Sequence, residues 1–252
     1  MLKPPPYRPI KPIAISPRWF PPNRTFGLYE HNGLCLPNVT SILAESFPFD
    51  KAKWQEVEPD IDHDAVTREA AQRGTAVHAA MEDWLAGCRD IYAAELAPWV
   101  EPLRKIVSRA DATLAVEIPI HHQIAGIGGY AGSCDGLMLV RNEVVIIDYK
   151  TKRHNKKVHP KFLNKQRLQL AAYATAINSI YRDQLPSPVV RTSLLFAHPD
   201  EGRAPTVVST SGDELVEYQQ LWAEMLRNWW LSHRDEIAIE QAAFNMQQQE
   251  AA

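Results

Sequence analysis

The sequence predicts an α/β fold in which helices flank a central mixed β-sheet. Segments rich in β-branched residues are interspersed among segments with helical periodicity, which favours a sheet covered by helices. Two consecutive strands, expected at about 130–140 and 143–150, are apolar on both faces and so belong at the centre of that sheet. The 252 residues, of which 45% are hydrophobic, are enough for one substantial core.

Capping residues and apolar spacing predict the helices. Asn38-Val39-Thr40 begins a short helix that runs to about Ser46. Alanines and Val77 form an apolar face over 64–86, where Gly74 indicates either a kink or two separate helices. Another helix lies within 91–110, broken at one of its two prolines. Pro160 opens a helix to about Tyr181, and Gly212-Asp213 precedes a last long helix that runs through Leu231.

The strands are predicted by short apolar runs bounded by turn residues. They lie at 113–122, 130–140, 143–150, 191–197 and 206–210. Arg141-Asn142 is a two-residue turn, because Asn tolerates the left-handed conformation that such turns require. The second and third strands therefore form one hairpin.

Composition divides the chain into a basic arm, residues 1–37, a folded domain, residues 38–240, and a Gln-rich tail, residues 241–252, expected to fray. The arm holds nine of the 19 prolines, so it is extended and either lies along nucleic acid or wraps the core. No apolar run reaches the roughly 18 residues of a membrane helix, and no secretory signal is recognisable. The three cysteines form neither a disulfide framework nor a zinc pair, which favours a reducing cytoplasm.

Two acids and a lysine meet on the predicted hairpin. If Val140 pairs with Glu143, Asp135 lies opposite Asp148, with Cβ atoms roughly 4.5–5.5 Å apart, and Lys150 shares the face of Asp148. Neighbouring buried carboxylates repel one another, and a hard divalent cation such as Mg²⁺ would remove that penalty. The sequence therefore predicts a metal-dependent hydrolytic centre. A buried Asp148–Lys150 ion pair, with Asp135 as a helix cap, is the alternative.

Other candidates are less specific. Glu117 lies in a strand that would adjoin the hairpin, and it is either a third carboxylate near the metal or an edge charge facing water. His78 is either a structural helical histidine or a metal ligand. Gln169 and Tyr173 share one helical face and could both be interior residues.

A basic run follows the hairpin and contains no Asp or Glu between Tyr149 and Arg182. It is either a solvated helix face or a contact surface for a polyanion, and its position beside the two acids favours phosphate contact. Gly126-Ile127-Gly128-Gly129-Tyr130-Ala131 fits a dinucleotide fingerprint, but a hairpin follows instead of a helix. We therefore expect no nucleotide cofactor, and no Walker A sequence is present.

Taken together, these residues resemble the PD-(D/E)XK nuclease superfamily, specifically its RecB-type branch. The matching segments, in order, are Arg73-Gly74-Thr75…His78, Glu117, Tyr130–Asp135, Val145–Thr151 and Gln169…Tyr173. Asn38–Leu43 is also similar to the helix start that precedes this region in the mitochondrial genome maintenance exonuclease and its phage and bacterial relatives. Cys134 and Lys152 depart from residues common in these motifs.

The resemblance implies a restriction-endonuclease-like core with Asp135, Asp148 and Lys150 as catalytic residues. Mg²⁺ or Mn²⁺ would be held by His78, Asp135, Asp148 and the Tyr149 carbonyl, and the additional site residues would be Glu117, Gln169 and Tyr173. DNA would contact the basic residues Arg73, Lys152, Arg153, Lys156, Lys157, Lys161, Lys165 and Arg167.

The activity expected from the resemblance is a metal-dependent DNA exonuclease that prefers single-stranded DNA and leaves 5′-phosphates, acting in DNA repair, recombination or replication. Two alternatives remain open: a nucleic-acid-binding module with an inactive site in a larger assembly, and a structure- or sequence-specific endonuclease. The expected location is the cytoplasm of a bacterial or phage-type system, with an organelle as the alternative. The motifs leave the oligomeric state open.

Overall fold

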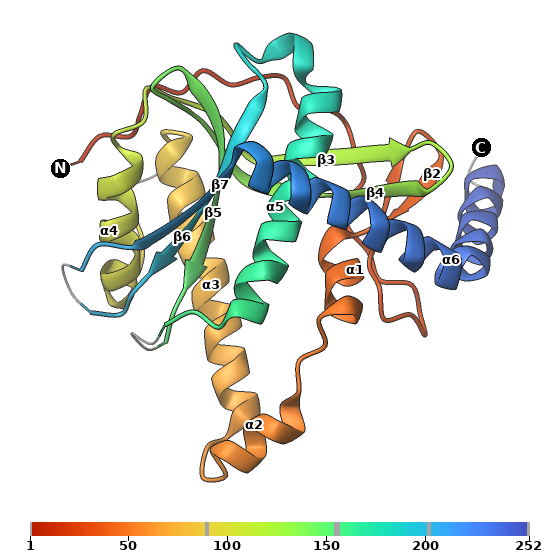
Figure 1. Cartoon of the computed structure of the whole chain (residues 1–252), viewed down its shortest axis with the longest axis horizontal. Coiled ribbons are helices and arrows are strands. Elements are labelled where there is room, and N and C mark those ends of the chain that lie inside the picture. The colour runs from red at the N-terminus through yellow and green to blue at the C-terminus, as the bar shows by residue number, and fades with distance from the viewer. Residues whose placement is uncertain (1, 89–90, 154–156, 201–202, 251–252) are drawn as a thin grey trace.

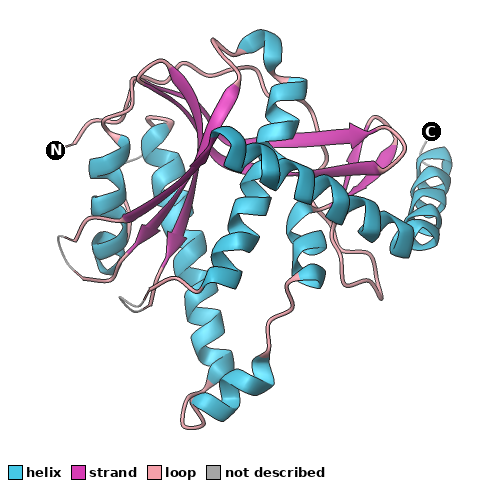
Figure 2. Ribbon diagram, viewed as in Figure 1, coloured by secondary structure: helices cyan, strands magenta, loops and turns pink. Residues whose placement is uncertain are grey.

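A mixed sheet separates two layers of helices in the computed structural model, which describes residues 2–88, 91–153, 157–200 and 203–250 (Figures 1 and 2). The strand order is β3-β4-β5-β6-β7, with β5 and β6 parallel and the other neighbours antiparallel. The strands are β3 (Ala112–Ile124), β4 (Gly128–Val140), β5 (Glu143–Thr151), β6 (Val189–Ala197) and β7 (Thr206–Ser211). This architecture confirms the predicted α/β fold class.

Each face of the sheet carries its own hydrophobic core. Helices α3 (His63–Leu85) and α4 (Ala97–Val107) cover one face, where Val145 and Ile147 pack. The opposite face packs Val144 and Ile146 beneath three further helices, α1 (Val39–Ser46), α5 (Pro160–Ile180) and α6 (Gly212–Glu250). Strand β5 is therefore buried on both faces, as its unbroken apolar run predicted.

The helices differ from the predictions mainly at prolines and glycines. Helix α3 runs through Gly74 as one helix. A 3₁₀ turn at Ala94–Leu96 precedes α4, and Pro98 lies in the first turn of α4, where its missing N–H costs nothing. Pro102 lies inside α4 without ending it. The short helix α2 (Lys51–Val57) was not predicted, since it buries none of its residues and therefore lacks an apolar face.

The N-terminal segment contains a hairpin that the sequence prediction missed. Strands β1 (Leu28–His31) and β2 (Leu34–Pro37) pair antiparallel around Asn32 and Gly33, whose φ angles are 51° and 81°. Asn-Gly is the strongest short hairpin signal, because both residues accept positive φ. Reading residues 1–37 as one proline-rich arm concealed this local signal.

The preceding part of the arm wraps the core along the outer edge of β3. The N–H groups of Arg8 and Ile10 donate to the carbonyls of Thr113 and Leu114 at 2.8 and 2.9 Å. The Thr113 N–H in turn donates to the Pro6 carbonyl at 2.9 Å. These bonds occupy backbone groups that an open sheet edge would leave unpaired.

Helix α6 continues to Glu250, past both the predicted end near Leu231 and the start of the expected frayed tail at residue 241. Its last turns contact the N-terminal segment: Gln241 accepts from the Cys35 N–H at 2.8 Å and donates to the Gly33 carbonyl at 2.7 Å. Arg24 also pairs with two acids of α6, Glu236 and Glu240, at 3.0 and 2.8 Å. Neither α6 nor any other helix in the described residues is both long and apolar enough to cross a membrane.

Two glycines offer a matched test of backbone strain. A Cβ added at Gly33 or Gly74 would meet nothing within 4 Å, but Gly33 has a φ of +81° whereas Gly74 is helical. We expect Gly33→Ala to lower the free energy of unfolding by about 1 kcal/mol, because left-handed backbone is costly for alanine. Gly74→Ala should raise it by about 0.5–1 kcal/mol. Urea denaturation measures both, and equal effects of the two substitutions would contradict this assignment of strain.

Candidate metal centre

The site is built where β4 and β5 separate. The predicted register is confirmed, since Val140 pairs with Glu143 and the turn residues Arg141 and Asn142 have φ angles of 51° and 65°. The ladder ends at the pair Gly136 and Ile147, one step before Asp135 would meet Asp148. At that step the Tyr149 N–H donates to the Asp135 carboxylate at 3.2 Å instead of to a strand carbonyl. A side chain thus replaces a backbone partner and leaves room for a site.

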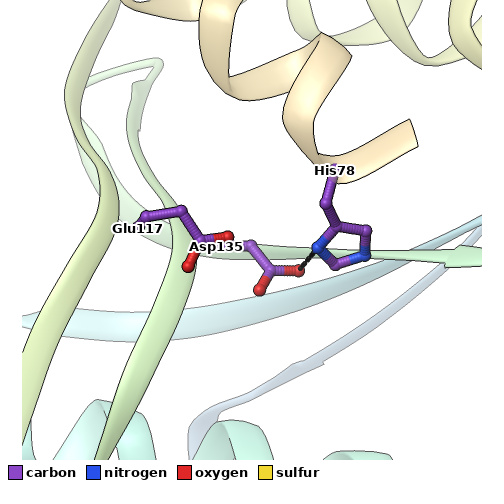
Figure 3. A group of neighbouring side chains, drawn as sticks. All are labelled: His78, Glu117 and Asp135. Carbon is purple, nitrogen blue, oxygen red and sulfur yellow. Dashed lines mark ion pairs between the residues drawn. The ribbon is translucent and has the colours of Figure 1, made fainter. Parts of the chain in front are cut away.

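Three ligand-type side chains converge at this separation. His78 of α3, Glu117 of β3 and Asp135 of β4 each offer an atom, and these atoms all lie within 4.8 Å of one another. Figure 3 shows the three side chains pointing into one space, with the Nδ1 of His78 3.3 Å from the Oδ2 of Asp135. Residues from a helix and two strands, separated in sequence, therefore form one cluster.

Glu117 reaches the cluster through an unusual backbone. Its φ is +44°, in the left-handed region that non-glycine residues rarely adopt. The flanking pairs, Val116 with Gly136 and Ile118 with Cys134, place it opposite Asp135. The Ser133 hydroxyl donates to its carboxylate at 2.9 Å. Of the two alternatives for Glu117, the structure supports the third carboxylate beside the candidate metal ligands, and a strained residue here fits a functional site.

His78 has more acceptors than a neutral ring can satisfy. Its Nε2 lies 2.8 Å from the Tyr149 carbonyl oxygen, while its Nδ1 faces Asp135. A neutral imidazole carries one N–H and can donate to only one of these two oxygens, so the other contact needs a proton or a cation between its two atoms. A cation coordinated by these groups would remove the conflict.

Burial and, next, the charge of nearby Asp148 raise the pKa of Asp135 to about 7, against the lowering effects of His78 and Lys150. The negative charge of the Asp135 carboxyl group is therefore only partly compensated when it ionises. Carboxylate oxygens, a backbone carbonyl and an imidazole are a donor set that suits Mg²⁺ or Mn²⁺. The residues present fit a divalent cation.

Asp148 and Lys150 form a tight pair beside this cluster. The Lys150 ammonium lies 2.8 Å from Oδ1 and 2.6 Å from Oδ2 of Asp148, whose residue is only 1% exposed. Burial lowers the pKa of Lys150, but Asp148 and then Asp135 outweigh it, so the pKa is raised and the ammonium stays charged. Asp148 is outside the three-residue cluster, and the ion-pair alternative describes its contacts. The other half of that alternative is wrong, because Asp135 lies in β4 and caps no helix.

Gln169 and Tyr173 pack beneath the acids. Both are buried on α5, and the Gln169 amide donates to the Tyr173 hydroxyl at 3.1 Å. Burial raises the pKa of Tyr173 well above its usual value, and the nearby charge of Asp135 adds to this effect. Gly132 lies so close that a Cβ there would be 3.1 Å from the Tyr173 ring. This side-chain pair supports β4 next to Asp135 from the α5 side.

The cluster opens to solvent on both sides of His78. One hollow of about 360 Å³ carries positive groups, and its lining includes Gly74, His78, Lys150, Lys152, His159 and Phe162. A second hollow of about 360 Å³ carries acids and is lined by Gly74, Thr75, His78, Ala79, Glu82 and Glu117. The two hollows share Gly74 and His78, and their opposite charges distinguish the two approaches to the site.

The structure places the predicted DNA-binding residues in several different surroundings. Arg153, Lys157 and Lys161 are exposed near the first hollow, while Arg73 stacks over the Trp99 ring with its guanidinium carbon 5.2 Å from the centroid. Arg167 is instead paired with Glu214 at 2.9 Å. Lysine 165 is half-buried, which lowers its pKa, and lysine 156 lies outside the described residues.

Some site features were not predicted. Ser133, which donates to Glu117, lies in the quoted motif, but no pattern in that motif indicates a role for a serine there. Trp99 supports Arg73 and also donates its indole N–H to the Lys152 carbonyl at 3.0 Å. No local sequence pattern indicates such a contact between α4 and the end of β5.

The raised pKa of Asp135 predicts how stability depends on pH without metal. Because the folded-state pKa exceeds the ordinary value near 3.9, the wild-type protein should lose stability as pH rises from about 4 through 7. Asp135→Asn removes this loss and should increase the free energy of unfolding at pH 8 by about 1–2 kcal/mol. Urea unfolding in EDTA at pH 5 and pH 8 measures the difference.

Exposed Asp183 provides the control for that experiment, since Asp183→Asn should change stability equally at both pH values. Magnesium at pH 8 should narrow the gap between wild type and Asp135→Asn, because a ligand stabilises the state that binds it. Lower stability of Asp135→Asn than of the wild type at pH 8 in EDTA would show that the carboxylate is already compensated.

Comparison with known proteins completes the description of the site. Among solved structures, the chain is similar to a protein called SSO0001, at 15% identity and a TM-score of 0.38, covering 75% of this chain and 83% of that one. It is also similar to a presumed exonuclease from Eubacterium rectale, at 10% identity and a TM-score of 0.42, covering 68% of each chain. No curated protein sequence matches. Residues 109–249 match the PD-(D/E)XK nuclease superfamily, and the chain therefore belongs to this superfamily of nucleases.

Proposed function

We propose that this nuclease is a metal-dependent DNA exonuclease that prefers single-stranded DNA and uses Mg²⁺ or Mn²⁺. The observation that carries the proposal is the convergence of His78, Glu117 and Asp135 within 4.8 Å, directly beside the Asp148–Lys150 pair. Within the superfamily, the motifs around these residues favour the RecB-type branch. Such an enzyme would act in DNA repair, recombination or replication in the cytoplasm.

The groups that would hold the cation are His78, Glu117, Asp135 and the carbonyl of Tyr149. All are hydrogen-bonded or packed in place by residues of the sheet, so little reordering is needed when the cation binds. When bound, a divalent cation would polarise the scissile phosphate and lower the pKa of its water.

Lys150 supplies a positive group for the reacting phosphate. Both carboxylate oxygens of Asp148 contact the Lys150 ammonium group, so this group is held in position before the substrate binds. Such a preorganised donor can orient the attacking water and stabilise negative charge that develops on phosphate oxygens. Asp148 thus acts through Lys150 in this arrangement, in addition to the metal-ligand role that family resemblance suggests for it.

The substrate strand would approach from the positively charged hollow. Lys150 and Lys152 line that hollow, and exposed Arg153, Lys157 and Lys161 follow it along the chain. The hollow on the other side of His78 is lined by Glu82 and Glu117, which would repel a phosphate backbone. Opposite charges on the two sides therefore favour one route for DNA.

Cleavage of single-stranded DNA tests the proposed reaction. Purified protein should shorten end-labelled linear DNA in Mg²⁺ or Mn²⁺, leave 5′-phosphates, and lose activity in EDTA. Asp135→Ala, Asp148→Ala and Lys150→Ala should each reduce the rate about 100-fold or more, because each removes charge at the reacting phosphate. Asp183→Ala, an exposed acid away from the site, should leave the rate unchanged.

Two outcomes would divide the proposal. If Asp148→Ala cuts as fast as the intact protein, the assigned centre is not the catalytic site. If closed circular DNA is cut as fast as linear DNA, the protein is an endonuclease and only the exonuclease part of the proposal fails. A duplex with blunt ends, run beside the single strand, measures the strand preference.

Ion pairing within the protein predicts which basic residues contact DNA. Lys157→Ala and Lys161→Ala should each reduce the slope of log affinity against log salt concentration by about 0.7, since each removes one phosphate contact to a single strand. Arg167→Gln should leave the slope unchanged, because Glu214 already holds that guanidinium. Fluorescence anisotropy with labelled single-stranded DNA in EDTA measures the slopes. An equal loss in all three variants would contradict this division.

A further inference from the structure

An apolar wall formed by Val158, Phe162 and Phe196 lines the positively charged hollow together with Lys150. Lys150, Tyr149 and His78 line one part of this cavity, which has a volume of about 360 Å³. One small cavity therefore combines a polar, cationic part with an apolar aromatic part.

Phe162 is the exposed part of that wall. It lies in the first turn of α5 and is 44% exposed, whereas Phe196 of β6 is 1% exposed. The two ring centroids are 6.5 Å apart, with the planes tilted by 55°. Phe196 thus belongs to the core and supports Phe162 from behind, and Phe162 presents an aromatic surface at the mouth of the cavity.

The polar groups at the mouth suit the backbone of the same ligand. His159 is the N-cap of α5, and its Nδ1 accepts from the Lys161 N–H at 3.2 Å. A neutral His159 ring therefore carries its proton on Nε2, the nitrogen free to donate to an acceptor in the cavity. Lys152 lines the same cavity. These donors and cations complement phosphate, whereas Phe162 complements a flat apolar ring.

We propose that Phe162 is a stacking platform for an unpaired base of the substrate strand, next to the phosphodiester held at Lys150. The inference rests on the proposed nuclease function and extends it to the form of the substrate. Aromatic side chains stack on bases without regard to sequence, and a basic groove follows the backbone of single strands. A base inside a duplex is already stacked and paired, so only an unpaired or extruded base can use this platform.

Binding of single-stranded DNA that carries one fluorescent 2-aminopurine near its end tests the platform. The measurements use Asp148→Asn with Mg²⁺, so that cleavage is suppressed while the cavity is kept. Phe162→Ala should weaken binding about 5- to 100-fold and remove the fluorescence quenching caused by stacking. Phe162→Trp should restore both. Phe49→Ala, a substitution of a 70% exposed phenylalanine outside the cavity, should change neither.

A merely structural role for Phe162 predicts a different pattern. Phe162→Leu keeps an apolar side chain against Phe196 but cannot stack, so we expect it to bind like Phe162→Ala. Full restoration of binding and quenching by Phe162→Leu would overturn the proposal, as would wild-type behaviour of Phe162→Ala. Circular dichroism melting identifies a variant that fails to fold. If Phe162→Ala does not fold, the comparison of binding and quenching between Phe162→Trp and Phe162→Leu decides between the two roles.

The same experiment separates this inference from the nuclease proposal. If the intact protein cuts no DNA but the Phe162 variants lose binding and quenching as described, the platform stands and the catalytic assignment fails. If cleavage depends on Asp148 but the Phe162 variants bind and quench like the parent, the nuclease assignment stands and the platform is wrong.

Discussion

The central constraint of this structure is the cluster of carboxylates at the point where the pairing of β4 with β5 ends. The two strands pair only as far as Gly136 and Ile147, and beyond that point the Asp135 carboxylate takes a backbone N–H that strand pairing would otherwise use. Glu117 adopts a left-handed backbone conformation, and its carboxylate joins Asp135 and His78. Three unfavourable features therefore coincide at this point: the strand pairing is interrupted, Glu117 has a strained backbone, and two carboxylates lie close together. A protein core tolerates such unfavourable terms when a ligand compensates them, and the side chains of His78, Glu117 and Asp135 fit a divalent cation.

The acids of this centre have two different surroundings, which divides their roles. Asp148 is nearly inaccessible, and its charge is matched by the ammonium group of Lys150. Asp135 and Glu117 face His78 and have no cationic lysine or arginine in contact among the ion pairs of the described residues. The Asp148–Lys150 pair is thus neutral as a whole, whereas the carboxylates of Asp135 and Glu117 could bind a cation. Lys150 lines the adjoining hollow, which places the fixed charge on the side where a phosphate backbone is attracted.

Features that depend on neighbouring residues could be predicted from the sequence. The turn at Arg141-Asn142 sets the hairpin register, and that register brings Asp135 and Asp148 to neighbouring positions. The sequence could not show that the pairing of β4 with β5 ends one residue pair before Asp135. This end depends on how β4 pairs with β3 and on the Asp135 side chain, which competes for the Tyr149 N–H. The position of Glu117 stayed open for a similar reason, since tertiary packing imposes its backbone conformation. The ion pair of Arg167 with Glu214 could not be predicted either, because the two residues are brought together only by the packing of α5 against α6. The hairpin at Asn32-Gly33, in contrast, was predictable from its turn and was obscured by the composition around it.

The contact between the last turns of α6 and the N-terminal hairpin affects the order in which the protein completes its fold. Gln241 bonds to Cys35 across a separation of 206 residues, and Arg24 reaches Glu236 and Glu240. A ribosome adds about 5–20 residues per second, so the hairpin waits roughly 10–40 s for these partners after it leaves the exit tunnel. All the residues of the metal centre are synthesised before that moment. The nascent chain therefore contains every residue of the charged centre before the bonds between α6 and the N-terminal hairpin can form.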